Sequence, residues 1–450
     1  MSHALTKINV LKTKLILFAA ILISVATFSQ KKWTLKECVN QALEKNISIQ
    51  QNKLSLELVK KDVEIAKGNF LPNLNASTGG NLNLGSGFDY VTQNRVTTSI
   101  FGGSMGLSAG YTVFNGFRNT NTYKQAQLGV ASGLLDLQKI ENDITLQVVN
   151  GYLNILFAKE NLNSAQVQYL ISKKQIEAAE SRFKSGVIAK GDLLNTQSTV
   201  ATNLQSVILQ ENTLDLALLN LAQLLQVSIE DFDIEPMEVD IPSSDLFYKS
   251  SSSVYNKSVD RMPEIIRAKL AIENAALNIK ISESYFLPSL SASAGLTTNY
   301  GYNLKAGPDT PFFSQLDDNL GYGIGFNLNI PIFNRFQTKY GVEKSKISKE
   351  ISETRLESEK IELKQTIEKA FLDVKSALKS FEAAKISLEA QKEAFKNAQE
   401  RYTYGAMTLF DFDQVRTRFV NAQGAMIRSK YDYVFKTKVL QFYSGDLVLN

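Results

Sequence analysis

Two aspartates, Asp411 and Asp413, are the residues whose type and spacing most suggest chemistry in this chain. Two neighbouring carboxylates can act as a general acid and a general base when their surroundings separate their pKa values. These two lie at the expected start of a helix, where carboxylates also face solvent and stabilise the helix N-terminus. No second base accompanies them, so the sequence favours a solvated helix start over a catalytic pair.

Two glycine-containing stretches have the spacing of nucleotide-binding loops but lack the residues that such loops need. The alternating glycines of 321–325 lie in an expected strand, and Phe326 takes the place of the third glycine of a dinucleotide-binding fingerprint. The stretch 186–191 has phosphate-loop spacing, yet Asp192 stands where a lysine would bind phosphate. We therefore expect no nucleotide and no other cofactor.

The chain lacks the side chains of most hydrolytic and zinc sites. Its only histidine is His3, within a segment 1–29 that has a basic start, an apolar run and small residues near Ser29. Such a segment is typical of a cleaved secretory signal peptide. Its removal leaves no histidine and one cysteine, Cys38, which we expect to be packed and inert. This composition excludes histidine-containing zinc sites and histidine-activated nucleophiles, so we expect no metal site and no enzyme.

Net charge and hydropathy exclude two further classes of protein. The formal net charge is +4, and loss of the three signal-peptide lysines leaves about +1, so nucleic acid is not an expected partner. No later segment reaches about 18 uninterrupted apolar residues, the minimum for a membrane-spanning helix. If this protein crosses a membrane, strands must do so.

The chain repeats itself once, with nearly the same offset between the two copies of each motif. The repeated pairs are FLPNLNAS at 70–77 with FLPSLSAS at 286–293, VFNGFR at 113–118 with IFNRFQ at 332–337, and RFKSG at 182–186 with RYTYG at 401–405. Each half predicts a helix, two strands, a long helix, a tight turn and a returning helix. The expected domains are the signal peptide at 1–29, a first repeat at 30–235, a linker at 236–262 and a second repeat at 263–450.

Long helices are expected where proline is absent, in 73–235 and after Pro331. In both regions large residues recur every seven positions, starting at Val148 and at Ile367, and small residues follow most of them by three. This pattern is typical of closely packed left-handed coiled coils. A plain two-stranded coiled coil would show the same heptads but would not account for the strands.

Four segments alternate between bulky apolar and small uncharged residues, at approximately 71–85, 100–114, 287–298 and 320–333. About 12 residues in a strand tilted by about 40° rise roughly 30 Å, which covers the ~25 Å apolar belt of an outer-membrane barrel. We expect lipid on the bulky face and a water-filled lumen on the small face. Because four strands cannot close a barrel, several subunits must associate.

These motifs resemble the TolC-type outer membrane efflux family over essentially the whole mature chain. The resemblance is carried by WTLKECVNQALEKN at 33–46, FLPNL, FLPSL, VFNGFR and RFKSGVIAKGDLLNTQ at 182–197. It implies a mainly α fold with a β-barrel part: a long antiparallel coiled-coil α-barrel in the periplasm, and four membrane strands per subunit that complete a 12-stranded β-barrel in a homotrimer. Its implied partners are outer membrane lipid, a periplasmic adaptor (membrane fusion) protein and an inner-membrane transporter.

The resemblance also assigns residues at the narrow periplasmic entrance. Asp411 falls on the first position of a pore ring of aspartates, and Gln414 occupies the second. Asp413 would complete the double ring only by turning inward. Asp192 and Tyr402 resemble a tip gate, in which a hydrogen bond between carboxylate and phenol contributes on the order of 1.5–3 kcal/mol.

The hairpin turns are the implied surface for the adaptor. Gly186 and Gly405 are expected at the turns, with Val187 and Ala406 beside them. Simple turn chemistry is the alternative explanation for both glycines. The implied function is a passive exit duct for a tripartite efflux pump or a type I secretion system, with drugs, metals and secreted proteins as open alternatives for the cargo. A periplasmic coiled-coil scaffold or adaptor without channel activity is the alternative function.

Overall fold

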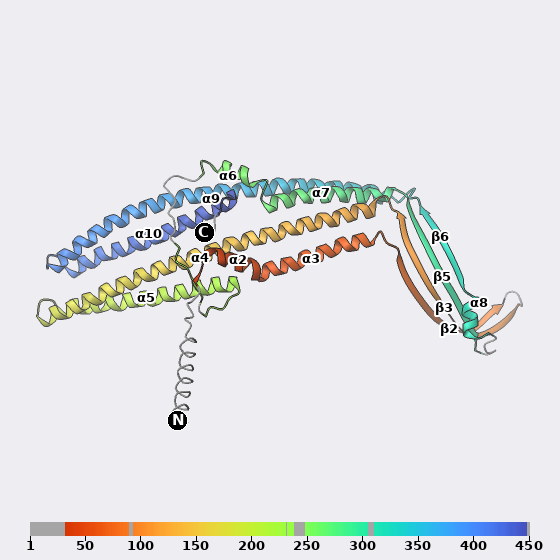
Figure 1. The fold of residues 1–450 in the computed structure, drawn as a ribbon, viewed down its shortest axis with the longest axis horizontal. Coiled ribbons are helices and arrows are strands. Elements are labelled where there is room, and N and C mark those ends of the chain that lie inside the picture. The colour runs from red at the N-terminus through yellow and green to blue at the C-terminus, as the bar shows by residue number, and fades with distance from the viewer. Residues whose placement is uncertain (1–31, 90–92, 231, 238–247, 305–309, 448–450) are drawn as a thin grey trace, which may run out of the picture. The chain divides into compact units, whose positions relative to one another are not determined.

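The computed structural model describes residues 32–447 except 90–92, 231, 238–247 and 305–309 (Figure 1). The expected signal peptide at 1–29 lies outside the described residues. The described chain is mainly helical and divides into two compact units, each assembled from separate stretches. The described residues of 32–51, 139–261 and 362–447 form one unit, and those of 52–138 and 262–361 form the other. The domain boundaries expected near residues 236 and 263 stay a prediction.

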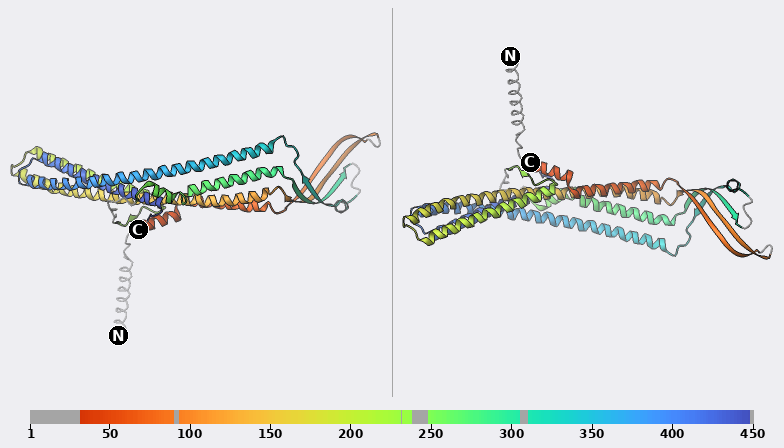
Figure 2. Two further views of the ribbon diagram at one scale, coloured as in Figure 1. Left: turned by 90° about the horizontal axis from the view of Figure 1, so that it is seen from above. Right: turned by 90° about the horizontal axis from the view of Figure 1, so that it is seen from below.

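The second unit contains a four-stranded antiparallel sheet with the strand order β2-β3-β5-β6. The strands are β2 (Asn73–Asp89), β3 (Asn94–Phe114), β5 (Ser289–Asn303) and β6 (Gly321–Asn329). The same unit holds α7 (Pro263–Glu283), the 3-10 helix η1 (Ser284–Phe286), α8 (Phe312–Asp318) and most of α3 (Ile47–Gly68). The three views show the sheet as a curled layer beyond the ends of the helices of this unit (Figure 2).

Four strand ends differ from the expected ones by four residues or more. β2 ends at Asp89 rather than near 85, and β5 ends at Asn303 rather than near 298. The other two differences have identifiable reasons. β3 begins at Asn94 rather than near 100, since it pairs with β2 from Asp89 to Asn73 without interruption. β6 ends at Asn329 rather than near 333, just before Pro331, which cannot donate a backbone hydrogen bond to a neighbouring strand.

The first unit is built from two long helical hairpins. They are formed by α4 (Arg118–Lys184) with α5 (Lys190–Leu225), and by α9 (Gln337–Thr403) with α10 (Leu409–Ser444), of which the first residues of α4 and α9 belong to the other unit. Shorter elements accompany them: α2 (Leu35–Lys45), α6 (Ser251–Ser258), and β1 (Lys32–Trp33) paired in parallel with β4 (Asp233–Ile234). Among the described residues, no helix combines the length and the apolar character needed to cross a membrane.

The expected heptad seam forms the buried side of the long helices. Val148 and Ile155 of α4 and Ile367 of α9 are fully buried, and Val374 is nearly so. The small residue that follows in the seam allows close approach: Gly151 lies against Leu221 of α5, where an added Cβ would stand 3.2 Å from Leu221 Cδ1. The sequence pattern therefore predicts the packing of each hairpin correctly.

The two repeats match in the order of their main helices and strands, although α8 has no counterpart in the first repeat. The shift in numbering that takes Arg118 onto Gln337 places α4 on α9 and α5 on α10 without changing a single boundary. A slightly smaller shift, which takes Ile47 onto Pro263, places the start of α3 on the start of α7. We call the first the late shift, because it relates the later elements of each repeat, and the second the early shift.

The strand register repeats as well. Leu74 of β2 pairs with Ala109 of β3. The early shift takes Leu74 onto Leu290 of β5, the late shift takes Ala109 onto Leu328 of β6, and these two residues pair with each other. The duplication read from the sequence is thus a duplication of the structure.

The strand-to-helix returns differ at one position between the repeats. Gly116 has φ of +68°, and a Cβ there would stand 2.8 Å from the carbonyl oxygen of Ser284, so the lack of space is what requires glycine. Arg335 occupies the equivalent position with φ of +54°. The next residue is left-handed in both repeats, at Phe117 and Phe336.

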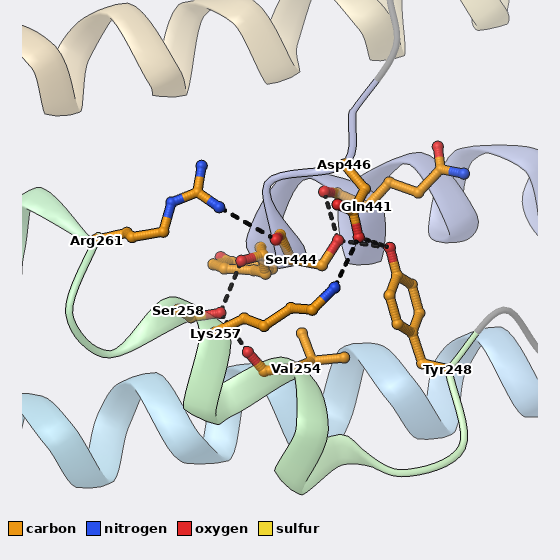
Figure 3. Close-up of polar contacts among 9 residues, drawn as sticks. Tyr248, Val254, Lys257, Ser258, Arg261, Gln441, Ser444 and Asp446 are labelled. Atoms are coloured by element: carbon orange, nitrogen blue, oxygen red, sulfur yellow. Dashed lines mark hydrogen bonds and ion pairs between the residues drawn. The ribbon is translucent and has the colours of Figure 1, made fainter.

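The C-terminal end of α10 is held by the segment that precedes α7 (Figure 3). The Tyr248 hydroxyl donates to Asp446 Oδ2 at 2.9 Å and also meets Ser444 Oγ, and Lys257 Nζ lies 3.4 Å from the same carboxylate. Ser258 Oγ donates to the Tyr443 carbonyl oxygen at 2.7 Å. These contacts tie the expected linker to the end of the second repeat within the first unit.

Candidate functional site

The two hairpin turns have one backbone design. Gly186 N donates to Phe183 O and Val187 N to Arg182 O, both at 2.9 Å, which closes the C-terminus of α4. The same pair of bonds closes α9 through Gly405 and Ala406. Both glycines are left-handed, with φ of +76° and +73°, and a Cβ at either would meet nothing within 4 Å. Backbone conformation, not lack of space, is therefore what favours glycine at both turns.

The turns are exposed surfaces. Gly186, Gly405 and Ala406 are exposed, and Val187 shows 69% of its surface to solvent. Beside the second turn lies an open depression of about 540 Å³ whose lining includes Arg401, Gly405, Ala406, Met407, Asp411 and Gln414. The structure thus brings four of the predicted site residues around one hollow.

Asp411 lies in the first turn of α10 and bonds reciprocally with the N-cap residue Thr408. Thr408 Oγ1 accepts from Asp411 N at 3.1 Å and donates to Asp411 Oδ2 at 2.7 Å. The side chain stays exposed, as does that of Gln414. The helix-start role expected from the sequence is present.

Asp413 has a different environment from Asp411. Its carboxylate is partly buried, and Arg416 Nη2 lies 3.0 Å from Asp413 Oδ1 at an angle that makes no hydrogen bond. Burial raises the pKa of Asp413, and the nearby Arg416 charge opposes this rise. Arg416 itself donates to Gln175 Oε1 of α4 at 2.9 Å, so Asp413 takes part in a contact between the two hairpins.

The two expected gate residues are not bonded to each other within one chain. The Tyr402 ring stacks on Phe412 with centroids 4.9 Å apart, and the Arg182 guanidinium lies 5.5 Å from the Tyr402 centroid. Among the described residues, neither the Tyr402 hydroxyl nor the Asp192 carboxylate has a side-chain hydrogen bond.

Three basic residues that the sequence analysis did not single out connect the hairpins. Arg182 Nη2 donates to the Thr403 carbonyl oxygen at 2.9 Å, Arg416 binds Gln175, and Lys430 Nζ lies 3.4 Å from Glu160 Oε2. All three contacts join α4 to α9 or α10. Only Arg182 carried a signal in the sequence, because its motif RFKSG recurs as RYTYG with Arg401 in the same place.

The sheet offers a second functional surface. Along β6 the bulky face is open, with Tyr322, Ile324 and Phe326 exposing 87%, 80% and 74% of their surfaces. The opposite face carries Gly323, Gly325 and Asn327. Within the described chain β2 and β6 each pair on one side only, so two sheet edges are open.

The described residues include no group of three or more histidine, cysteine, aspartate or glutamate side chains placed to hold a metal ion. Cys38 is fully buried and makes no disulfide. What the structure assembles is a set of surfaces: exposed turns, a carboxylate at a helix start and an apolar sheet face.

Comparison with known proteins identifies the family of the chain. The family model described as "Outer membrane efflux protein" matches residues 38–226 and 254–445. The outer membrane protein TolC of Salmonella enteritidis is 22% identical over 371 residues, which is 76% of this chain and 74% of TolC. The pyoverdine export outer membrane protein OpmQ of Pseudomonas aeruginosa is 25% identical over 376 residues, covering 81% and 75%.

A solved structure has the same fold. The CmeC outer membrane channel of Campylobacter jejuni superimposes with a TM-score of 0.74 at 20% identity, over 92% of this chain and 86% of CmeC. The family match spans both repeats and most of the chain. The chain therefore belongs to the TolC-type outer membrane efflux protein family, and it is a non-enzymatic outer membrane efflux channel with a periplasmic extension.

Proposed function

We propose that three copies of the chain form one passive exit duct. The observation that carries this proposal is the sheet: it has four strands, two open edges and a fully exposed apolar face on β6. Open strand edges are not tolerated in lipid, so the sheet must be closed by further copies. Three copies of four strands make a closed barrel of 12, within the range of known outer-membrane barrels.

The long hairpins continue the duct on the periplasmic side. We place a periplasmic adaptor at the exposed turns around Gly186, Val187, Gly405 and Ala406, and an inner-membrane transporter behind it as the source of energy. The similarity to OpmQ, a pyoverdine export protein, supports export as the direction of transport. Nothing in the wide, small-residue face of the strands selects one cargo over another.

The entrance is a ring of Asp411 carboxylates, one from each copy. Close carboxylates concentrate negative potential in a narrow bore, so the ring attracts cations. Gln414, at the second ring position, is uncharged, and Asp413 lies beside Arg416 and does not replace it. The entrance therefore has one ring of carboxylates instead of the two that the family resemblance implies. Asp192 and Tyr402, whose polar groups have no partner among the described residues of the chain, form the tip gate between neighbouring copies.

Purified mature protein tests this function directly. We expect it to require detergent, to have the mass of three chains by light scattering, and to conduct ions in planar bilayers. A periplasmic scaffold would be soluble without detergent and would not conduct. A soluble monomer would contradict the duct.

A further inference from the structure

The contacts between the two repeats of one chain suggest how neighbouring copies would meet in the proposed ring. β3 of the first repeat pairs with β5 of the second, and α4 of the first hairpin contacts α10 of the second. In both cases a later element of the first repeat meets an element of the second repeat. If copies follow one another in the same sense, β6 and α9 must meet β2 and α5 of the next copy.

We propose that neighbouring copies meet in the register of the contacts between the repeats of one chain, with Lys344 facing Asp62 and Lys379 facing Glu211 across the interface. This inference rests on the proposed ring and adds its register and its contacts. It is supported by the structural equivalence of the two repeats, which have the same register within each strand pair and matching boundaries of the long helices. Adding the late shift to the residue numbers of β3 and α4 gives positions in β6 and α9. Subtracting the early shift from those of β5 and α7 gives positions in β2 and α3. Each contact between repeats thereby predicts a contact between β6 or α9 of one copy and β2 or α3 of the next.

The shifts predict the register of the strand pair that closes the barrel. Ser104 of β3 pairs with Asn299 of β5 in the chain. The shifted residues are Gly323 of β6 and Asn83 of the β2 strand in the next copy. Both belong to the small-residue face, so the pairing keeps the bulky face of β6 continuous with that of β2.

The same shifts bring together opposite charges that are separate in one chain. Gln125 Nε2 of α4 donates to Asn278 Oδ1 of α7 at 2.9 Å. The shifted positions hold Lys344 of α9 and Asp62 of α3 in the next copy, both exposed and without an ion-pair partner among the described residues. An amide contact inside the chain therefore becomes an ion pair between copies.

A second charge pair follows in the hairpins. Glu160 of α4 and Lys430 of α10 lie 3.4 Å apart in the chain. Moving Glu160 forward and Lys430 back by the late shift gives Lys379 of α9 and Glu211 of α5 in the next copy. The acidic and basic positions have exchanged, so the attraction is preserved. Lys379 already contacts Glu382 of its own helix, and that contact leaves most of its side chain exposed.

Cysteine cross-linking tests the register. Gly323→Cys combined with Asn83→Cys should join the chains into a covalent trimer under mild oxidation, since a Cβ at Gly323 meets nothing within 4 Å. Gly323→Cys with Asn81→Cys, on the same face but two residues away, is the matched control and should cross-link far less. Each single variant controls for Cys38, which is buried.

Charge reversal tests the helical contacts. Asp62→Lys and Lys344→Asp should each lower the temperature at which the detergent-solubilised trimer dissociates, and the double variant should restore it. If the control pair Gly323→Cys with Asn81→Cys cross-links instead, or if the protein is a trimer that neither cysteine pair links, the inferred register is wrong but the ring of three copies stands. A chain that is monomeric in detergent would overturn the ring itself and the inference with it.

Discussion

At the scale of single residues, the structure separates two aspartates that look equivalent in the sequence. Asp411 is exposed and caps α10, whereas Asp413 is partly buried beside Arg416. Proximity along the chain suggested that either could face the pore. Asp413 is the one drawn into a tertiary contact, because Arg416 beside it binds Gln175, 241 residues away along the chain. No local sequence pattern contains that information.

We expect Asp411→Asn to weaken the block of single-channel currents by divalent cations. Asparagine removes the charge but keeps a side-chain oxygen for the cap with Thr408, so a loss of block would report charge alone. Asp413→Asn is the matched control and should leave the block unchanged. Equal block in the wild type and Asp411→Asn would remove the ring from the mechanism.

Two carboxylates should affect stability with opposite signs as pH changes. Burial raises the pKa of Asp413, so its ionised form costs stability once pH rises above the ordinary value of about 3.9 and through the raised one. Asp413→Asn should therefore raise the melting temperature at neutral pH, and the gain should disappear below about pH 3.

Asp446 is the natural comparison for Asp413. A hydrogen bond from Tyr248 lowers the pKa of Asp446, so its contribution to stability is present above the ordinary pKa and is lost as pH falls through the lowered one. Asp446→Asn should lower the melting temperature at neutral pH. Thermal unfolding of both variants at the two pH values checks the signs, and a shift in the same direction for both would contradict this assignment.

At the scale of elements, the long helices and the strands were predictable because each has a period. Proline gaps and heptads predict α4 and α9, and alternation predicts β2, β3, β5 and β6. The helix α8 was not predicted: it is short, follows Pro311, and is held by long-range contacts such as Thr298 Oγ1 to Leu316 O at 2.7 Å. The basic contacts between hairpins were missed for the same reason, since they depend on the tertiary fold.

The role of the turn glycines can be decided by substitution with asparagine. Asparagine accepts the left-handed conformation but adds bulk, so Gly186→Asn should preserve folding and melting temperature. If the turn is the docking surface, the same variant should lose most of its binding to an immobilised adaptor. Gly424→Asn, at an open position within α10, is the control. If Gly186→Asn binds the adaptor as well as the wild type does, the only role of Gly186 is to form the turn.

The contacts between hairpins should keep the resting channel narrow. Arg416→Met keeps an unbranched, flexible side chain but removes the bond to Gln175, and we expect a higher resting conductance in planar bilayers. Lys360→Met, which removes a contact to Glu357 within one helix, should leave conductance unchanged. If both variants conduct like the wild type, the contact between Arg416 and Gln175 has no part in gating.

At the scale of the whole molecule, the duplication is the feature that relates sequence, fold and assembly. The repeats were visible in the sequence through three short motifs, and the structure extends the equivalence to whole elements. The C-terminal contacts around Tyr248 and Asp446 have no such signal, because they join a connecting segment to a distant helix end. The order of the helices and strands thus repeats along the chain, whereas the long-range contacts that hold them together do not.

The difference between Gly116 and Arg335 bears on the symmetry of this assembly. Inside the chain the carbonyl of Ser284 approaches so closely that no side chain is possible at Gly116. Arginine at the matching position forbids an equally close approach at the seam between neighbouring chains. In the proposed ring of three copies, tight and wide junctions would then alternate around the circumference, so the ring would have threefold and not sixfold symmetry.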